Sequence, residues 1–227
     1  LTEGKHAGAI LLCRDVTELR RRERELITKD ATIREINHRV KNNLQTVSAL
    51  LRMQARRMTS ADAKSALEEA MRRVTTIAMV HEALSTTLDE TVVFDDLIDR
   101  ILRMTAEVAS ADAQVTTVRH GSFGLIPAED ATPLALVLTE LVSNAVQHGI
   151  GAGNCGTVEV RAKRNDRRIR VEVLDDGAGI DEETPQASGL GTQIVSTLVE
   201  NELNGTITWK KRDGNGTRVV IKLRVHG

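Results

Sequence analysis

The positions of glycine and proline divide this sequence into two halves. Neither residue occurs between Ala9 and His120, whereas all three prolines and 14 of the 16 glycines lie from Gly121 onward. Glycine and proline interrupt helices more strongly than any other residues. The first half can therefore form very long helices and the second half cannot. The helical pattern breaks at residues 86–94, which marks the expected boundary.

Apolar residues recur about every seven positions through the first half, which predicts a long amphipathic helix. A helix from about Asp15 to Arg57 would be roughly 65 Å long at about 1.5 Å per residue. Such a rod cannot bury its apolar stripe alone. The stripe consists of Leu19, Leu26, Ile33, Ile36, Val40, Leu44, Val47, Leu50 and Leu51.

A second helix is predicted after the polar segment at residues 58–63, where Thr59 or Ser60 can cap its N-terminus. Two antiparallel helices with apolar stripes are half of a four-helix bundle, so we expect a homodimer. The alternative is a monomeric hairpin that packs on the second half of the chain. The stripe of the second helix consists of Leu67, Ala70, Val74, Ile77 and Leu84.

The first residues differ from the helical segment that follows them. The chain begins with Leu1 instead of methionine, which suggests a fragment or a processed chain. Ala9 to Cys13 form a short apolar run that predicts a strand. We therefore expect residues 1–14 to be the end of an upstream domain. The run of arginine and glutamate after Asp15 is most simply the solvated face of a coiled coil.

Composition excludes several classes of protein. The net charge is −1, which argues against direct binding to nucleic acid. Cys13 and Cys155 are far apart and form no metal-ligand cluster, so we expect a reduced, cytoplasmic setting. No apolar run approaches the roughly 20 residues that span a bilayer, so we expect no membrane contact in this segment. With only three aromatic residues, the core is expected to be aliphatic.

From residue 94 onward, helical and alternating patterns follow one another. Asn165-Asp166 and residues 213–216 mark hairpin turns. Helices covering one face of a mostly antiparallel sheet would form an α/β sandwich. Helices are predicted at about 94–109, 128–149 and 190–203, and strands at about 113–120, 158–162, 169–173, 207–209 and 219–225.

A histidine lies on the polar side of the first predicted helix. At about 100° per residue, His38 falls roughly 160° from the centre of the apolar stripe, and Asn42 lies on the same side. Neutral imidazole is nucleophilic near neutral pH. Arg39 and Lys41 supply positive charge that favours a phosphoryl group, and Asn42 can hydrogen-bond the ring or that group. An exposed helical histidine can equally be only solvated.

Three further clusters occur in the second half. Glu140, Asn144 and His148 share one face of a helix, where they are either satisfied internally or functional. Asp175 at a strand end can accept a hydrogen bond from an exocyclic amine. Glycines beside it let the backbone approach a flat ligand, and glycines at a helix N-terminus suit phosphate. These glycines are Gly177 and Gly179 after Asp175, and Gly189 and Gly191 before the last helix.

At this point the chain resembles a sensor histidine kinase. Residues 35–54, EINHRVKNNLQTVSALLRMQ, are similar to the phosphoacceptor helix of the subfamily marked by His-Arg-x-Lys-Asn-Asn. The glycine clusters resemble the GHKL (Bergerat) ATP-binding domain of gyrases, heat-shock chaperones, histidine kinases and mismatch-repair proteins. The implied fold is a long helical hairpin, dimeric as a four-helix bundle, followed by an α/β sandwich. The implied domains are a PAS-type remnant (1–14), a coiled-coil signalling linker (15–34), a dimerisation and phosphotransfer hairpin (35–90) and a catalytic ATP-binding domain (91–227).

The resemblance also implies roles for individual residues. The expected cofactors are ATP and Mg²⁺, with Asn144 as the metal ligand. His38 would be the phosphoacceptor and Glu140 a polarising group beside Asn144. The remaining ATP-binding residues would be His148 near phosphate or ribose, Asp175 at adenine, Gly177 and Gly179 shaping the adenine pocket, Gly189 and Gly191 at the lid and phosphates, and Thr217 at the adenine end.

The implied function is two-component signalling. His38 would be autophosphorylated from Mg-ATP, and the phosphoryl group would pass to an aspartate of a response-regulator receiver domain, in this case an RNA-binding antiterminator. Two positions depart from the family pattern: Arg39 replaces an acidic residue, and Asp176 replaces an asparagine. The rival interpretations are a GHKL ATPase or serine kinase, and a non-catalytic dimeric scaffold.

Overall fold

The computed structural model describes residues 15–85, 91–109, 114–151, 153–180, 189–212 and 214–226. Within the first helix, the side chains of residues 19, 22–31, 33, 34, 37 and 38 are not described. The predicted strand from Ala9 to Cys13 and the expected PAS-type remnant therefore lie outside the described residues, as does most of the expected lid between Gly179 and Gly189.

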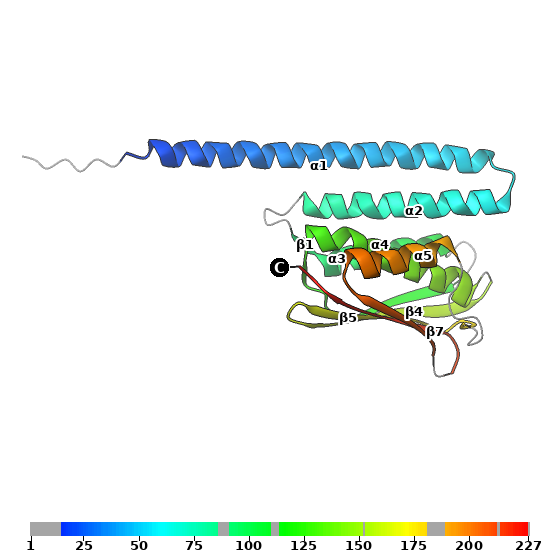
Figure 1. Cartoon of the computed structure of the whole chain (residues 1–227). Coiled ribbons are helices and arrows are strands. Elements are labelled where there is room, and N and C mark those ends of the chain that lie inside the picture. Colours follow the sequence, from blue (N-terminus) through cyan, green and yellow to red (C-terminus); the bar gives the residue numbers. More distant parts are fainter. Residues whose placement is uncertain are drawn as a thin grey trace, which may run out of the picture.

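Two antiparallel helices form the first half. α1 (Thr17–Arg57) is a continuous helix of 41 residues, and α2 (Ala61–Leu84) folds back along it. Figure 1 shows that α1 extends well beyond the end of α2. The Oγ atom of Ser60 accepts a hydrogen bond from the amide of Ala63 at 3.4 Å, so Ser60 is the cap. The predicted hairpin is confirmed.

α1 exposes part of its apolar stripe. Ile36 is 54% exposed, Val47 42% and Leu50 50%, although α2 lies along the same helix. Stripe residues that stay exposed in a single chain leave apolar surface for a further partner. Among the helices that the structure describes, none is both long and apolar enough to cross a membrane.

The second half contains a five-stranded sheet with the strand order β2-β4-β5-β7-β6. β2 and β4 are parallel, and every other neighbouring pair is antiparallel. Both predicted hairpins form, and Asp166 takes the left-handed conformation (φ 55°) in the first turn. The strands are β2 (Gln114–Gly121), β4 (Cys155–Asn165), β5 (Arg168–Asp175), β6 (Thr206–Lys211) and β7 (Thr217–Arg224).

A second, two-stranded sheet pairs β1 (Thr91–Val93) with β3 (Leu125–Pro127). Sequence patterns did not predict this sheet, because three residues are too few to show alternation. β1 runs directly into α3 (Phe94–Ala109). Phe94 packs against Phe123 with ring centroids 5.1 Å apart, and both rings are fully buried. The rest of the described core is almost entirely aliphatic, as expected.

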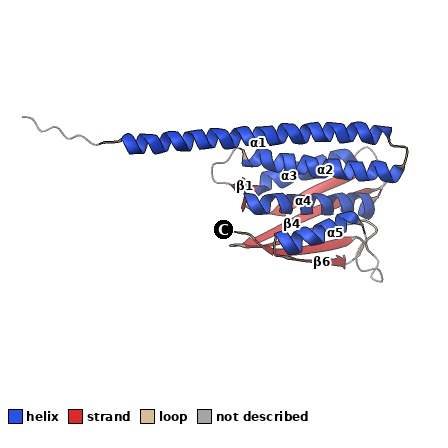
Figure 2. Cartoon of the chain, turned by 45° about the horizontal axis from the view of Figure 1, so that its top comes forward, coloured by secondary structure: helices blue, strands red, loops and turns tan. Residues whose placement is uncertain are grey.

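Helices α3, α4 (Ala128–Asn144) and α5 (Leu190–Thr197) cover one face of the five-stranded sheet, and α2 lies over this helical layer (Figures 1 and 2). This confirms the α/β sandwich. The helix was expected to end at Gly149, but a π-helical turn (Ala145–Ile150) continues through that residue and Gly151 (φ 75°) ends it. A second π-helical turn (Leu198–Glu202) follows α5.

His226 ties the last residues after β7 to the start of α4. Its Nδ1 lies 2.7 Å from Oδ1 of the buried Asp130, and its amide donates to Oδ2 at 2.7 Å. The hydrogen bond to Asp130 raises the pKa of His226 above its ordinary 6.5. A raised folded-state pKa means that this contact contributes its full stability below the unfolded-state pKa and loses it as the pH rises through the folded-state pKa.

The melting temperature of the wild type should therefore fall relative to His226→Gln as the pH rises from about 6 to about 8. Differential scanning calorimetry of the two proteins at matched ionic strength measures this difference. A constant difference between their melting temperatures across this range would contradict the prediction.

Candidate functional site

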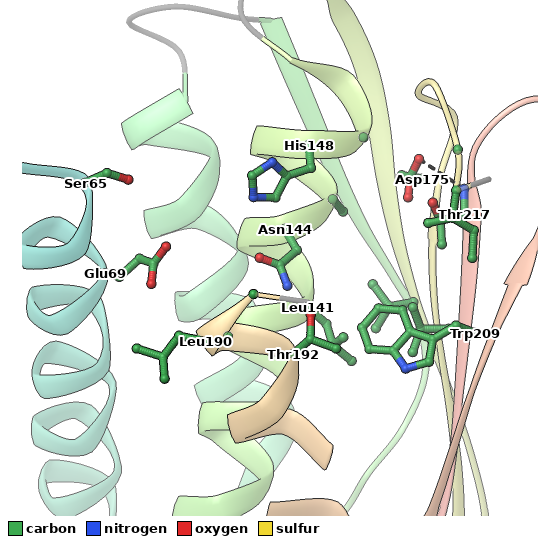
Figure 3. Close-up of a pocket in the computed structure, with 18 of the residues that line it drawn as sticks. Ser65, Glu69, Leu141, Asn144, His148, Asp175, Leu190, Thr192, Trp209 and Thr217 are labelled. Atoms are coloured by element: carbon green, nitrogen blue, oxygen red, sulfur yellow. Dashed lines mark hydrogen bonds between the residues drawn. The ribbon is translucent and has the colours of Figure 1, made fainter. Parts of the chain in front are cut away.

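A cavity of about 570 Å³ lies between α4, α5, the sheet and α2. Its size is within the range of small-molecule sites, about 300–1,000 Å³. Figure 3 shows Asp175 and Thr217 on the strand side of this pocket, with Asn144 and His148 projecting from the α4 side. Seven residues that the sequence singled out line it together: Asn144, His148, Asp175, Gly179, Gly189, Gly191 and Thr217.

Asp175 is held at the C-terminal end of β5 with one carboxylate oxygen fixed. Oδ1 accepts hydrogen bonds from the amides of Gly177 at 3.0 Å and Thr217 at 3.1 Å. No described residue donates to Oδ2, although the residue is only 4% exposed. Because Asp175 lines the cavity, Oδ2 is available to accept a hydrogen bond from a ligand amine such as the exocyclic amine of adenine. Thr217 acts here through its backbone.

The turn after β5 depends on glycine for close backbone contact. A Cβ atom on Gly177 would lie 1.9 Å from the carbonyl oxygen of Gly149, so no other residue fits at position 177. Gly177 thus brings this turn against the end of the α4 region without lining the cavity itself. The neighbouring Asp176 accepts a hydrogen bond from the amide of Thr157 at 2.7 Å. This contact gives Asp176 a structural role that needs no metal.

At the other end of the pocket, the start of α5 closely approaches α4. A Cβ atom on Gly191 would lie 2.9 Å from Oε2 of Glu140 and 3.8 Å from Nδ2 of Asn144. Gly191 therefore permits the approach that places the free N–H groups of the helix N-terminus beside Asn144, and such groups bind phosphate. Gly189 differs, because no described atom lies within 4 Å of a Cβ built there.

These groups fit a magnesium nucleotide. Asp175 supplies an acceptor for an amine at one end of the cavity, and the N-terminus of α5 supplies donors for phosphate at the other. The side-chain carbonyl of Asn144 lies beside the start of α5 and is the hard oxygen ligand that Mg²⁺ prefers. His148 lines the same wall. The chemistry of the described residues therefore matches the expected ATP and Mg²⁺.

Glu140 adjoins the pocket, but its carboxylate is already hydrogen-bonded to another side chain. Arg73 of α2 donates to both of its carboxylate oxygens, at 2.7 Å to Oε1 and 3.0 Å to Oε2. The side chain of Glu140 is 6% exposed and that of Arg73 19%. The hydrogen bonds to Glu140 raise the pKa of Arg73, so this arginine stays charged. Glu140 is thus not free to polarise a reacting group in this arrangement.

The structure does not bring His38 and Asn42 to the pocket. The side chain of His38 lies outside the described residues, but its backbone belongs to α1, one turn before Lys41. Lys41 pairs with Glu82 near the end of α2, whereas the pocket adjoins Glu69. These two positions on α2 are about 20 Å apart at about 1.5 Å per residue. Asn42 is exposed, and its carbonyl accepts from Thr46 at 3.0 Å.

Several pocket residues were missed by sequence reasoning. Trp209 faces the cavity from β6, and strand alternation could have placed it beside the inward-facing Val219, its partner in β7. Ser65 and Glu69 project toward the pocket from α2 (Figure 3), and no local pattern connects that helix with the second half. The other missed residues include Leu141 and Thr192.

Comparison with known proteins shows the family to which the chain belongs. A family model described as "Histidine kinase" matches residues 35–109, and one described as "Histidine kinase-, DNA gyrase B-, and HSP90-like ATPase" matches residues 129–227. The sensor histidine kinase PdtaS of Mycobacterium tuberculosis is 49% identical over 98% of this chain. This chain belongs to the histidine kinases. The kinase chain described here spans 45% of the length of that relative.

Other histidine kinases show the same relationship. PdtaS of Mycolicibacterium smegmatis is 48% identical over 98% of this kinase chain, which spans 45% of that protein. The solved histidine kinase domain of a blue-light-activated histidine kinase from Erythrobacter litoralis is 26% identical, with a TM-score of 0.62. That match covers 88% of this chain and 94% of the solved one. The hairpin and the sandwich therefore occur together in a related kinase.

Proposed function

We propose that this chain is the kinase part of a two-component sensor, which transfers the γ-phosphoryl group of ATP to an imidazole nitrogen of His38. The phosphoryl group then passes to an aspartate in the receiver domain of a response regulator, an RNA-binding antiterminator. One observation carries the kinase proposal: Asp175, Asn144 and the phosphate-binding start of α5 line a single cavity. The match of the His38 segment to a histidine kinase model supports the choice of acceptor.

The chain's own residues supply binding and the nucleophile. Oδ2 of Asp175 accepts the adenine amine, and the N-terminal amides of α5, with Gly189 and Gly191, hold phosphate oxygens. When bound through Asn144, Mg²⁺ withdraws charge from those oxygens. His38 attacks as neutral imidazole, and Asn42 offers an amide to the phosphoryl group once the two sites meet.

Arg39 takes no part as a base. It pairs with Glu35, one turn earlier in α1, at 2.7 Å, and a guanidinium stays protonated. A neutral imidazole already has a free lone pair, so the first step needs no deprotonation. Glu140, once released from Arg73, can orient the attacking ring or a water beside Asn144. This leaves Arg39 as a source of positive charge near the acceptor.

The proposed domain division follows the expected boundaries. Residues 15–34 form a coiled-coil signalling linker, 35–90 a phosphotransfer hairpin and 91–227 the catalytic domain. The exposed stripe on α1 supports a homodimer, in which two hairpins form a four-helix bundle in the cytoplasm. A net charge of −1 supports action on nucleic acid only through the regulator.

A charge in the exposed stripe should separate the dimer. In Leu50→Glu, a side chain that is 50% exposed in one chain would become a buried carboxylate in the bundle, which is costly without a partner. Sedimentation equilibrium should show a dimer for the wild type and a monomer for the variant. Ala49→Glu, at a neighbouring exposed position of α1, should remain dimeric. A monomeric wild type would favour the hairpin packed only on its own second half.

The chemistry of the phosphate label tests the kinase proposal. Incubation with γ-labelled ATP and Mg²⁺ should produce a label that is lost in acid and retained in base, which is the behaviour of phosphohistidine. An acid-stable label would instead identify a serine kinase. Nucleotide hydrolysis without a label would identify an ATPase. A scaffold with a degenerate pocket would not bind ATP.

Nucleotide binding should be visible in the fluorescence of Trp209. This is the only tryptophan in the chain, and it is half-buried in the wall that also contains Thr217. A bound adenine would replace water near the indole, so titration with ATP should change the emission intensity and wavelength. Asp175→Ala serves as the control, because it should lose the change. An unaltered spectrum at ATP concentrations that calorimetry shows to be saturating would place the base elsewhere.

A further inference from the structure

Two polar contacts join α2 to α4. The first is the bidentate pair between Arg73 and Glu140, residues that are 67 positions apart in the sequence. The second lies about one helical turn along, where the hydroxyl groups of Thr76 and Thr139 are 3.0 Å apart and both residues are fully buried. Charge-assisted, bidentate pairs are strong and directional. These contacts therefore fix where the catalytic domain sits along the hairpin.

This docking makes α2 one wall of the nucleotide pocket. Asp62 and Glu69 of α2 line the same cavity as Asn144 and the start of α5, and Figure 3 shows Glu69 projecting toward it. Glu69 also accepts a hydrogen bond from Arg73 at 3.2 Å. The phosphate end of the cavity thus faces two carboxylates. The phosphates of ATP would be repelled from them, so nucleotide binding opposes this docked state.

The docked state also keeps the pocket away from the phosphoacceptor. Lys41, one turn after His38 in α1, is paired with Glu82 near the far end of α2. The pocket lies beside Glu69, about 20 Å away along the helix. In a dimer whose two-fold axis runs along the hairpin, residue 38 of the second copy would lie at the same height along the hairpin as residue 38 of the first. It would therefore be equally far from the pocket. Transfer within one chain or between two chains therefore requires the catalytic domain to leave this position.

We propose that Arg73 is a gating residue: by holding Glu140 it docks the catalytic domain on α2 in an inhibited position, and phosphorylation of His38 requires that contact to break. The proposal rests on the kinase function proposed above. Removing Arg73 leaves the carboxylate of Glu140 buried without its cation, which strongly destabilises the docked state. Release of the catalytic domain from α2 exposes this carboxylate to water and is therefore favoured. Release also frees Glu140 to act beside Asn144.

A disulfide across the contact tests the docked state directly. Thr76→Cys with Thr139→Cys, in a Cys13→Ser/Cys155→Ser background, places two thiols where hydroxyl groups now lie 3.0 Å apart, close enough for a bridge after a small adjustment. The oxidised protein should be labelled by γ-labelled ATP at least about 20-fold more slowly than the reduced protein, and reductant should restore the rate. Single-cysteine variants treated identically control for oxidation.

Two results would overturn the proposal. Labelling of the oxidised protein at the reduced rate would show that the docked state is active, and failure of the bridge to form would show that the docked state is not populated. Bridge formation is read by mass spectrometry and needs no activity. If the bridge forms but the reduced protein carries no phosphohistidine, the kinase function itself fails while the docking stands. The two failures are therefore distinguishable.

A second variant tests the arginine itself. Arg73→Met should raise the initial rate of His38 labelling about tenfold and tighten ATP binding, because docking no longer competes. Arg73→Lys, which keeps the charge but not the bidentate geometry, should fall between the variant and the wild type. Lys64→Met is the matched control, since Lys64 is an exposed cation of α2 that lies 4.0 Å from Glu68. A lower or unchanged rate in Arg73→Met would instead make Arg73 a structural or activating partner of Glu140.

Discussion

His38→Gln is expected to reduce labelling by γ-labelled ATP at least about 100-fold, to the background of the assay. Glutamine is polar, of similar size and compatible with a helix, so α1 should persist. Its amide nitrogen carries no available lone pair and cannot replace the imidazole as a nucleophile. Position 38 lies about 20 Å along the hairpin from the pocket, so ATP binding measured by calorimetry should be unchanged.

Two matched variants make this result specific to His38. His81→Gln makes the same substitution at another histidine of the hairpin, in α2, and should keep the wild-type label. Asn144→Ala should lose the label for a different reason, because the pocket loses its oxygen ligand for Mg²⁺, and its nucleotide affinity should fall as well. A label that survives in His38→Gln would remove the acceptor assignment and favour a serine kinase.

Asp175→Asn is expected to raise the dissociation constant for ATP about 100-fold, which corresponds to roughly 2.7 kcal/mol. In the wild type, Oδ1 is engaged by the amides of Gly177 and Thr217, and Oδ2 remains for the ligand. An asparagine that keeps its oxygen on those two amides presents its NH₂ group to the adenine amine. Two donors then face each other, and neither is satisfied. Calorimetric titration with ATP and Mg²⁺ measures the loss.

The nucleobase preference provides the control for Asp175→Asn. Guanine carries an acceptor oxygen where adenine carries its amine, so the amide of asparagine can donate to it. The ratio of ATP to GTP affinity should therefore fall in the variant, whereas general damage to the pocket would weaken both nucleotides equally. Unfolding in urea checks that the β5 turn is intact. An unchanged affinity for ATP would mean that Asp175 does not contact the base.

Much of the architecture followed from local patterns. The absence of glycine and proline from residues 9–120 predicted α1 and α2. α1 ends at the expected Arg57, and Ser60, one of the two expected caps, precedes α2. Alternation predicted the β4-β5 and β6-β7 hairpins. The three-residue strands β1 and β3 were missed. They are strands because they pair with each other across a long stretch of sequence, and they are too short to show an alternation of apolar and polar residues. The π-helical end at Ile150 was also missed.

The residues of the candidate site also fall into two groups, those that the sequence identified and those that only the tertiary structure brought to the site. The sequence alone determined the residues that act within one short segment or on one element, such as Asp175 with Gly177, or Asn144 one turn from Glu140, because backbone geometry fixes such neighbours. Only the tertiary structure decided that Arg73 holds Glu140, that Glu69 and Trp209 line the pocket, and that His38 lies far from it. Those relations depend on how two independently patterned halves pack, and packing is set by complementary surfaces that no local period encodes.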